Sequence, residues 1–165
     1  MDTCASLWSA LSELGTDRKS LMINLGGGVV TDLGGFVACC YQRGIDFINI
    51  PTTLLSMVDA SIGGKNGVDL GLLKNQIGVI KTPKMVIVDT SFLNTLSSRE
   101  MRSGLAEMIK HGLIANPKHY SDLKNLSKLT LEDLDALIYD SILVKKHIVE
   151  QDPTEQDLRK TLNFG

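Results

Sequence analysis

Apolar residues in the first 96 positions fall into short blocks that alternate between helical and strand-like spacing. A 3.6-residue period predicts a helix over 5–14, ended by a glycine. The apolar run 20–25 predicts a buried strand that enters a turn of three glycines, and 29–41 predicts the helix after that turn. Two further runs predict strands at 47–50 and 85–88. Strand, glycine turn, helix and strand in this order are typical of a Rossmann-like parallel sheet.

Beyond residue 96 the pattern becomes helical. A capping box at 97–100 predicts the start of a helix that extends to about residue 114. A second cap at 130–133 predicts a helix that extends to about residue 150. No strand pattern follows, so we expect a partial α/β domain at 1–96 and a partial all-helical domain at 97–165.

Composition excludes several classes of partner. The 165 residues are 43% hydrophobic, which is typical of globular domains. The net charge is −2 and the basic residues are dispersed, so we expect neither a nucleic acid nor a membrane as partner. The three cysteines show no paired spacing, and the first residues lack the pattern of a signal peptide. We therefore expect a cytoplasmic protein.

The glycine turn is the first candidate for chemistry. Glycines before a helix leave backbone N–H groups free, and these groups and the helix dipole both attract a phosphate. Asp32 falls in the first helical turn, where the dipole favours a carboxylate. However, Gly26-x-Gly28-x-x-Thr31 lacks the last glycine of the dinucleotide fingerprint. A phosphate cradle and a plain tight turn are therefore equally compatible with this segment.

A long glycine-bearing stretch, 61–78, lies between the second and third predicted strands, and loops of this length are usually functional. Asp59 precedes it, and it contains Lys65, Lys74 and Asn75. Lysines beside glycines can reach a phosphate or a sugar hydroxyl. The alternative is a pair of solvated surface lysines. The neighbouring glycine pairs favour a binding site.

Two groups of polar residues fall on the predicted helices of the second region. Glu107, Lys110 and His111 share one helical face. Glu107 with His111 could begin a zinc site, but without a third ligand an exposed hydrogen-bonded pair is the better interpretation. Lys145 interrupts an apolar stripe, so its side chain either extends to solvent, which is the commoner arrangement, or faces a polar cavity. The remaining histidines, His119 and His147, are predicted to be surface residues.

In this order, these segments resemble the 3-dehydroquinate synthase family over nearly the whole chain. The matching stretches are LGGGVVTDLGGFVA, Arg43-Gly44, IPTTLLSMVDASIGGKNGVD, LKNQIG, FLNTLSSRE, SGLAEMIKHG and QDPTEQDLRKTLNFG. The resemblance implies part of a Rossmann-like domain followed by the start of a helical domain. It also implies NAD and a divalent metal, zinc or cobalt, as cofactors, and a homodimer in the full-length protein.

The resemblance implies a role for individual positions. NAD would contact Gly26, Gly27, Gly28, Val29, Val30, Thr31, Asp32, Thr52, Thr53, Leu55, Lys65, Lys74, Phe92, Leu93, Asn94 and Thr95. The catalytic and substrate-binding residues would be Arg43, Asp59, Lys65, Asn75, Lys110, Lys145, Arg159 and Asn163. Glu107 would be the carboxylate metal ligand, and His111 matches no ligand position of the family motif.

The implied reaction belongs to the shikimate pathway. It converts the sugar phosphate 3-deoxy-D-arabino-heptulosonate 7-phosphate to 3-dehydroquinate and phosphate. NAD would oxidise the C5 hydroxyl transiently, so that phosphate elimination, reduction and an intramolecular aldol step can follow. A zinc ion suits polarisation of the C5 oxygen, and lysine and arginine suit neutralisation of the leaving phosphate.

Some positions depart from the family pattern. Asn66 stands where threonine is commoner, Ala60 where serine is common, and Thr31 where glycine is common. The family motif LNFG continues with a metal-binding histidine, and a further βαβ half precedes the matching region. We therefore expect an incomplete fragment with little or no activity, an exposed sheet edge and an open apolar face.

Three other functions are alternatives. The first is another sugar-phosphate cyclase, such as a 2-deoxy-scyllo-inosose synthase or an epi-valiolone synthase. The second is a metal-dependent alcohol dehydrogenase like glycerol dehydrogenase, although the stretches PTTLLSMVDASIGGK and KNQIG argue against it. The third is an inactive remnant that serves as an interaction module.

Overall fold

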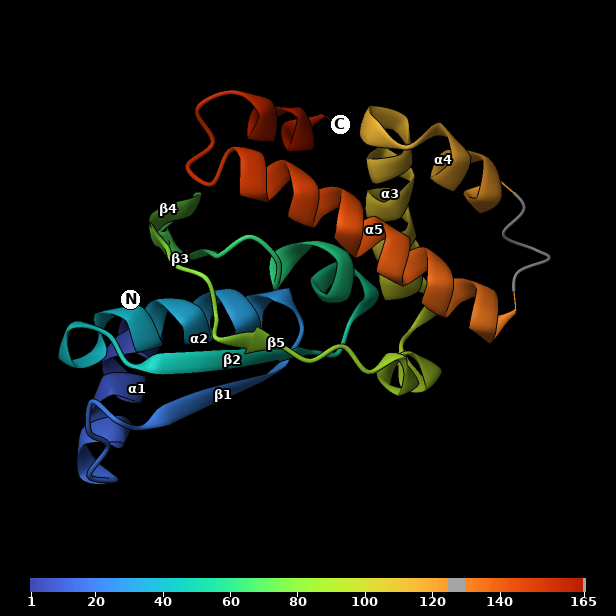
Figure 1. Ribbon diagram of the computed structural model, residues 1–165. Helices are drawn as coiled ribbons and strands as arrows, with labels where there is room; N and C mark the ends of the chain where they lie inside the picture. The colour runs from blue at the N-terminus through green and yellow to red at the C-terminus, as the bar shows by residue number, and fades with distance from the viewer. Residues whose placement is uncertain (125–129, 165) are drawn as a thin grey trace.

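The N-terminal half contains a small parallel sheet. A computed structural model describes residues 1–124 and 130–164 (Figure 1). In it, β1 (Leu21–Gly26), β2 (Asp46–Pro51) and β5 (Met85–Val86) pair in the order β1-β2-β5, and both pairings are parallel. The three predicted strands and the Rossmann-like arrangement are confirmed, although the third strand is only two residues long.

One face of this sheet is covered by helices. The helix α2 (Gly28–Cys40) packs on β1 and β2, and α1 (Asp2–Glu13) packs beyond α2 through Trp8, whose Nε1 donates to Val37 O at 3.1 Å. Between sheet and helix, the buried Asn24 Nδ2 donates to Asn49 Oδ1 at 2.9 Å. A Cβ on Gly34 would lie 2.0 Å from Asn24 Oδ1, so only glycine allows this close packing.

The glycine-bearing stretch was predicted to be a loop, and this prediction is wrong for most of its length. It folds into an antiparallel hairpin of β3 (Lys65–Leu70) and β4 (Leu73–Ile80), which packs on α2 through Val68, Ile77 and Val79. The buried Asn66 donates to Gly64 O and Lys81 O, each at 2.8 Å, and so joins the two ends of the hairpin. Interspersed glycines hide the strand alternation in the sequence.

Helices dominate the C-terminal half (Figure 1). They are α3 (Ser98–Ala115), α4 (Pro117–Leu123) and α5 (Leu131–Gln151). Ser97 and Thr130 cap α3 and α5 as predicted. Within the described residues, none of the helices combines the length and the apolar character needed to span a bilayer.

The α4 helix was not predicted, and its presence corrects one assignment. His119 was expected at the surface, but α4 packs on α3 and buries its side chain to 1% exposure. Gly112 of α3 permits this contact, because a Cβ there would lie 2.7 Å from the backbone nitrogen of Tyr120. His147 is exposed, as predicted.

Four short helical turns complete the described part of the chain, and one of them joins the two halves. They are η1 (Tyr41–Arg43), η2 (Ser56–Ala60), η3 (Thr90–Thr95) and η5 (Leu158–Asn163), of which η2 is a π-helical turn and the others are 3-10. Leu54, Met57 and Val58, which precede or belong to η2, pack in one core with Met108 of α3 and Ile138 of α5. The segment after β2 is thereby fixed against the helical half.

Candidate functional site

A cleft of about 590 Å³ lies among the hairpin, η2, α3, α5 and η5. Residues from distant parts of the sequence meet in its wall. Apart from Arg43, every residue that the family resemblance assigns to the substrate lines it: Asp59, Lys65, Asn75, Lys110, Lys145, Arg159 and Asn163. Asp32 lines it as well, from α2, but it lies just past the first helical turn in which the sequence predicted it.

Lys145 faces this polar cleft and does not extend to solvent. Its side chain is buried, and its Nζ donates to the backbone oxygen of Asp59 at 2.6 Å and to the Asp59 carboxylate. Burial lowers the pKa of Lys145 below its ordinary value, and the charge of Asp59 opposes that shift. A buried ammonium group is stable only with such a partner, so Asp59 and Lys145 form one unit.

The carboxyl group of Asp32 differs from an ordinary surface aspartate. Burial raises its pKa to about 6, with a further contribution from the negative charge of Asp59, while Lys145 acts in the opposite direction. The cleft therefore contains a carboxyl group that exchanges its proton near neutral pH, which is a property of acid–base groups in active sites.

The segment after α5 folds around two charged side chains. Asp152 accepts backbone N–H groups from Gln156, Asp157 and Arg159, at 2.9, 2.7 and 3.0 Å. The guanidinium group of Arg159, buried to 1% exposure, donates to Gly63 O at 2.8 Å and so connects this segment to the start of the hairpin. The folded segment after α5 therefore brings Arg159 to the cleft.

Glu155 was not predicted as a site residue, yet it lines the cleft. Its carboxylate pairs with Lys65 and accepts a hydrogen bond from Asn163 Nδ2 at 3.0 Å. Glu155 adopts a left-handed backbone conformation with φ of 59°, which is unusual for a residue with a side chain. Its position four residues before Arg159, inside a stretch that resembles the family, is the signal that could have identified it.

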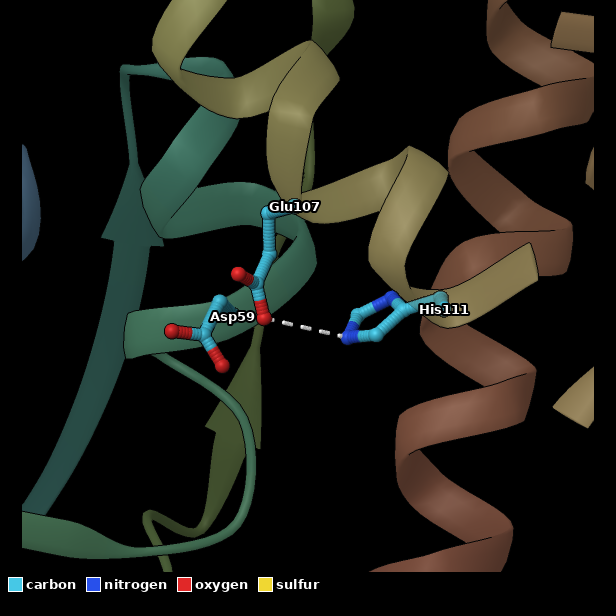
Figure 2. A group of neighbouring side chains, drawn as sticks. All are labelled: Asp59, Glu107 and His111. Atoms are coloured by element: carbon cyan, nitrogen blue, oxygen red, sulfur yellow. Dashed lines mark ion pairs between the residues drawn. The ribbon is translucent and has the colours of Figure 1, made fainter. Parts of the chain in front are cut away.

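A second group of polar side chains adjoins the cleft. Figure 2 shows Asp59 on η2 and Glu107 and His111 on α3, with Glu107 directed toward the other two. One ligand atom from each residue lies within 4.8 Å of the others. Glu107 Oε1 is 2.5 Å from Lys110 Nζ and 3.3 Å from His111 Nε2. The prediction of an exposed Glu107–His111 pair is wrong, because His111 is fully buried.

The surroundings of Glu107 keep it ionised. Burial alone would raise its pKa, but the nearby His111 ring and the Lys110 ammonium group outweigh burial and lower the pKa to about 2. Among the described residues, neither Glu107 Oε1 nor His111 Nε2 has a hydrogen-bond partner of normal geometry. The neighbouring carboxylates of Glu107 and Asp59 fit a site for a divalent cation such as zinc.

The glycine turn lies at the carboxyl end of the parallel strands. Thr52 N donates to Gly26 O at 3.0 Å, and Thr53 lies against Gly27. A Cβ on Gly28 would lie 3.1 Å from the Cβ of Ala60, which lines the cleft. The turn therefore borders the cleft, in the place where α/β proteins bind their ligands.

Several predicted residues lie apart from the cleft lining. Arg43 is exposed, with φ of 70°, at the opposite end of α2 from the glycine turn. Lys74 is exposed on β4, and Leu93 is buried in the core of the helical half. Val29 is largely exposed at the start of α2. Their assigned roles stay predictions.

Family models for the two halves of one enzyme match consecutive parts of the chain. The 3-dehydroquinate synthase N-terminal model matches residues 1–103, and the C-terminal model matches residues 104–165. The chain belongs to the 3-dehydroquinate synthase family. The resemblance found in the motifs is thereby confirmed.

Curated relatives bear the family name. A 3-dehydroquinate synthase of Parabacteroides distasonis is 48% identical over 163 residues, which are 98% of this chain and 46% of the relative. One of Dictyoglomus thermophilum is 50% identical over 159 residues, which are 94% of this chain and 45% of the relative. The chain spans about half the length of the curated relatives it matches.

Solved structures of related cyclases share the fold. The 2-epi-5-epi-valiolone synthase ValA of Streptomyces hygroscopicus, with NAD⁺ and Zn²⁺ bound, has a TM-score of 0.90 at 28% identity, covering 99% of this chain and 48% of that one. A 2-deoxy-scyllo-inosose synthase, complexed with carbaglucose-6-phosphate, NAD⁺ and Co²⁺, has a TM-score of 0.90 at 26% identity, covering 99% and 46%. An iron-containing alcohol dehydrogenase of Thermotoga maritima shares the fold alone, at 14% identity and a TM-score of 0.67.

Proposed function

We propose that this protein acts as a 3-dehydroquinate synthase, converting 3-deoxy-D-arabino-heptulosonate 7-phosphate to 3-dehydroquinate and phosphate. The observation that carries the proposal is the convergence of Asp59, Lys145 and Arg159 on one cleft beside Glu107. Relatives that are about half identical to the chain bear this enzyme's name. The arrangement suits elimination of phosphate from a polyhydroxylated acid, which needs cations, hydroxyl-binding groups and a metal ion together.

Each cofactor has a set of residues that would hold it. The glycine turn at 26–28 with Thr52 and Thr53 would hold NAD, and Glu107 would hold the metal ion. When bound, these groups supply reversible hydride transfer and Lewis-acid polarisation of a hydroxyl oxygen. The related cyclases with NAD⁺ and Zn²⁺ or Co²⁺ in their structures support this assignment.

The protein's own side chains account for binding and charge neutralisation. Lys145 and Arg159 line the cleft, where their positive charge would bind the substrate's phosphate. Asn75 and Asn163 offer amide groups for substrate hydroxyls. Because the pKa of Asp32 is raised to about 6, it can release or accept a proton under physiological conditions.

Three further assignments are parts of the same proposal. We place the boundary between the two domains near residue 96, where the sequence pattern changes. We also propose a homodimer and a cytoplasmic location, which rest on the resemblance to the family.

A binding experiment with two adjacent lysines tests the function. Lys145 is buried in the cleft, whereas Lys146 is exposed and its Nζ lies 3.7 Å from Glu150 Oε1. In calorimetric titrations with NAD and Co²⁺ present, Lys145→Met should weaken binding of the heptulosonate phosphate at least about 10-fold, as expected for a charge-assisted hydrogen bond. The matched Lys146→Met variant should bind like the unmodified chain. Equal affinities of the two variants would refute the proposal.

The second candidate function is a cyclase that acts on another sugar phosphate. It is favoured by the structural similarity to 2-deoxy-scyllo-inosose synthase, whose complex contains a carbocyclic glucose 6-phosphate analogue. The same titration with glucose 6-phosphate separates the two functions. Tighter binding of glucose 6-phosphate than of the heptulosonate phosphate would favour this second candidate.

A further inference from the structure

His111 has no exposed surface although it lies beside the cleft. It follows Glu107 by one turn of α3, and α5 approaches it from the other side through Ser141, which is also fully buried. His111 Nδ1 lies 2.7 Å from Ser141 Oγ, and Nε2 lies 3.3 Å from Glu107 Oε1 (Figure 2). Each ring nitrogen therefore has one neighbour, although the contact with Glu107 is not aligned as a normal hydrogen bond.

A histidine in this position can either ligate a cation or hold the carboxylate of Glu107. A cation enters through the cleft, and its ligands need atoms that face it. Asp59 lines the cleft, whereas neither Glu107 nor His111 does, and Nε2 of His111 has no exposed area. The side chain of Glu107 keeps 14% exposure, and this exposed area lies on atoms other than Oε1. The arrangement favours the holding role.

The hydrogen-bonding capacities of the three groups set the direction of the contacts. A carboxylate oxygen only accepts, so the nitrogen that faces it carries the ring proton. A neutral imidazole has a single N–H group, so Nδ1 is then an acceptor and the Ser141 hydroxyl donates to it. We propose that Ser141 and His111 act as a positioning pair that fixes Oε1 of Glu107 and leaves its other oxygen free for a metal ion.

This inference rests on the proposed role of Glu107 as a metal ligand. The position of Lys110 explains why Oε1 needs a second residue to hold it. Lys110 also contacts Oε1, at 2.5 Å, but it lines the cleft, where a substrate can draw its ammonium group away. His111 is enclosed between α3 and α5, so no ligand displaces it. In metalloenzymes, mutation of a residue that holds a metal ligand in this way commonly weakens metal affinity about 10- to 100-fold.

Cobalt titration of four variants tests the pair. His111→Leu should weaken Co²⁺ affinity about 10- to 100-fold. His111→Gln should retain most of the affinity, because an amide N–H can replace Nε2–H. Ser141→Ala should weaken affinity less, and it should add nothing when combined with His111→Leu. The matched control is His119→Leu, a buried histidine on the adjacent helix, which should leave affinity unchanged.

The absorption spectrum of bound Co²⁺ and the pattern of affinities separate this role from ligation and from general packing. The absorption spectrum of saturating Co²⁺ should be the same in every variant, because no ligand is lost. A shifted spectrum, or an equal loss of affinity in His111→Gln and His111→Leu, would show that His111 is itself a ligand. An equal loss in His119→Leu would show that packing alone explains the effect.

Nitrogen NMR of the unmodified chain tests the pair without any metal. We expect His111 as the Nε2–H tautomer, and a bare Nε2 would overturn the inference. A chain that shows the expected tautomer but binds no Co²⁺ would refute the metal role of Glu107 and leave the positioning pair intact. The two failures are therefore distinguishable.

Discussion

Ion pairs on the cleft side of the helical half differ from those on its outer surface. In the cleft, Lys145 is buried against Asp59. On the outside, Lys118 pairs with Asp122 at 2.8 Å, but its side chain is 84% exposed. The residue types are the same in both places. The difference teaches that burial, and not the presence of a salt bridge, sets the two pairs apart. Burying charges costs stability that exposed pairs do not lose, and this is why we propose the buried pair as part of the site.

Removal of one acidic partner from each pair gives the largest expected contrast. Asp59→Asn leaves the Lys145 ammonium buried without its counter-charge, and we expect the free energy of unfolding to fall by about 3 kcal/mol. Asp122→Asn should lower it by less than about 1 kcal/mol. Urea denaturation measures both values. Similar losses in the two variants would contradict the distinction between the two surfaces.

Local sequence patterns predicted the elements that carry clear periodicity or caps. The starts of α3 and α5 follow from Ser97 and Thr130, because their side chains accept backbone N–H groups of the first turn. The hairpin was missed because glycines interrupt its alternation. The α4 helix was missed because it is only seven residues long, although Asn116 caps it and Pro117 begins it.

Local patterns identified single candidate residues of the site, and only the resemblance to the family grouped them. Lys145 sits on an apolar stripe, but the helical period left open whether its side chain reaches solvent or a polar cavity. Its partner Asp59 is 86 residues away, and no local rule brings the two together. Glu155 and the buried His111 depend on how α5 and the segment after it pack, and this is information that the fold supplies.

The two buried histidines give a second comparison, between a ring with a hydrogen-bonding neighbour and a ring without one. His119 has no hydrogen-bond partner at either ring nitrogen in the described part of the chain, whereas His111 contacts Ser141. Burial lowers the pKa of His119 below its ordinary value of 6.5. The unfolded chain then binds more protons than the folded one below pH 6.5, so the free energy of unfolding falls as the pH decreases.

His119→Leu should remove this dependence on pH. We expect the variant to be more stable by about 1 kcal/mol at pH 7.5, since it removes a buried polar group without a partner. This difference in the free energy of unfolding should increase at pH 5.5, because His119 of the unmodified chain is then protonated when unfolded and has to release its proton on folding. Urea denaturation at the two pH values measures both effects. An advantage that shrinks at the lower pH would mean that His119 is charged in the folded protein.

The smallest effect on stability is expected on the face of β1 that α2 does not cover. Leu21, Ile23 and Leu25 point to this face and are more than half exposed, as the expectation of an open apolar face requires. Because apolar side chains in water promote association, Ile23→Thr should reduce light scattering at high protein concentration. It should change the free energy of unfolding by no more than about 0.5 kcal/mol, since Ile23 is 57% exposed. A larger loss of stability would show that β1 is covered on both faces in solution. Ile23 would then belong to the buried residues and not to the exposed ones.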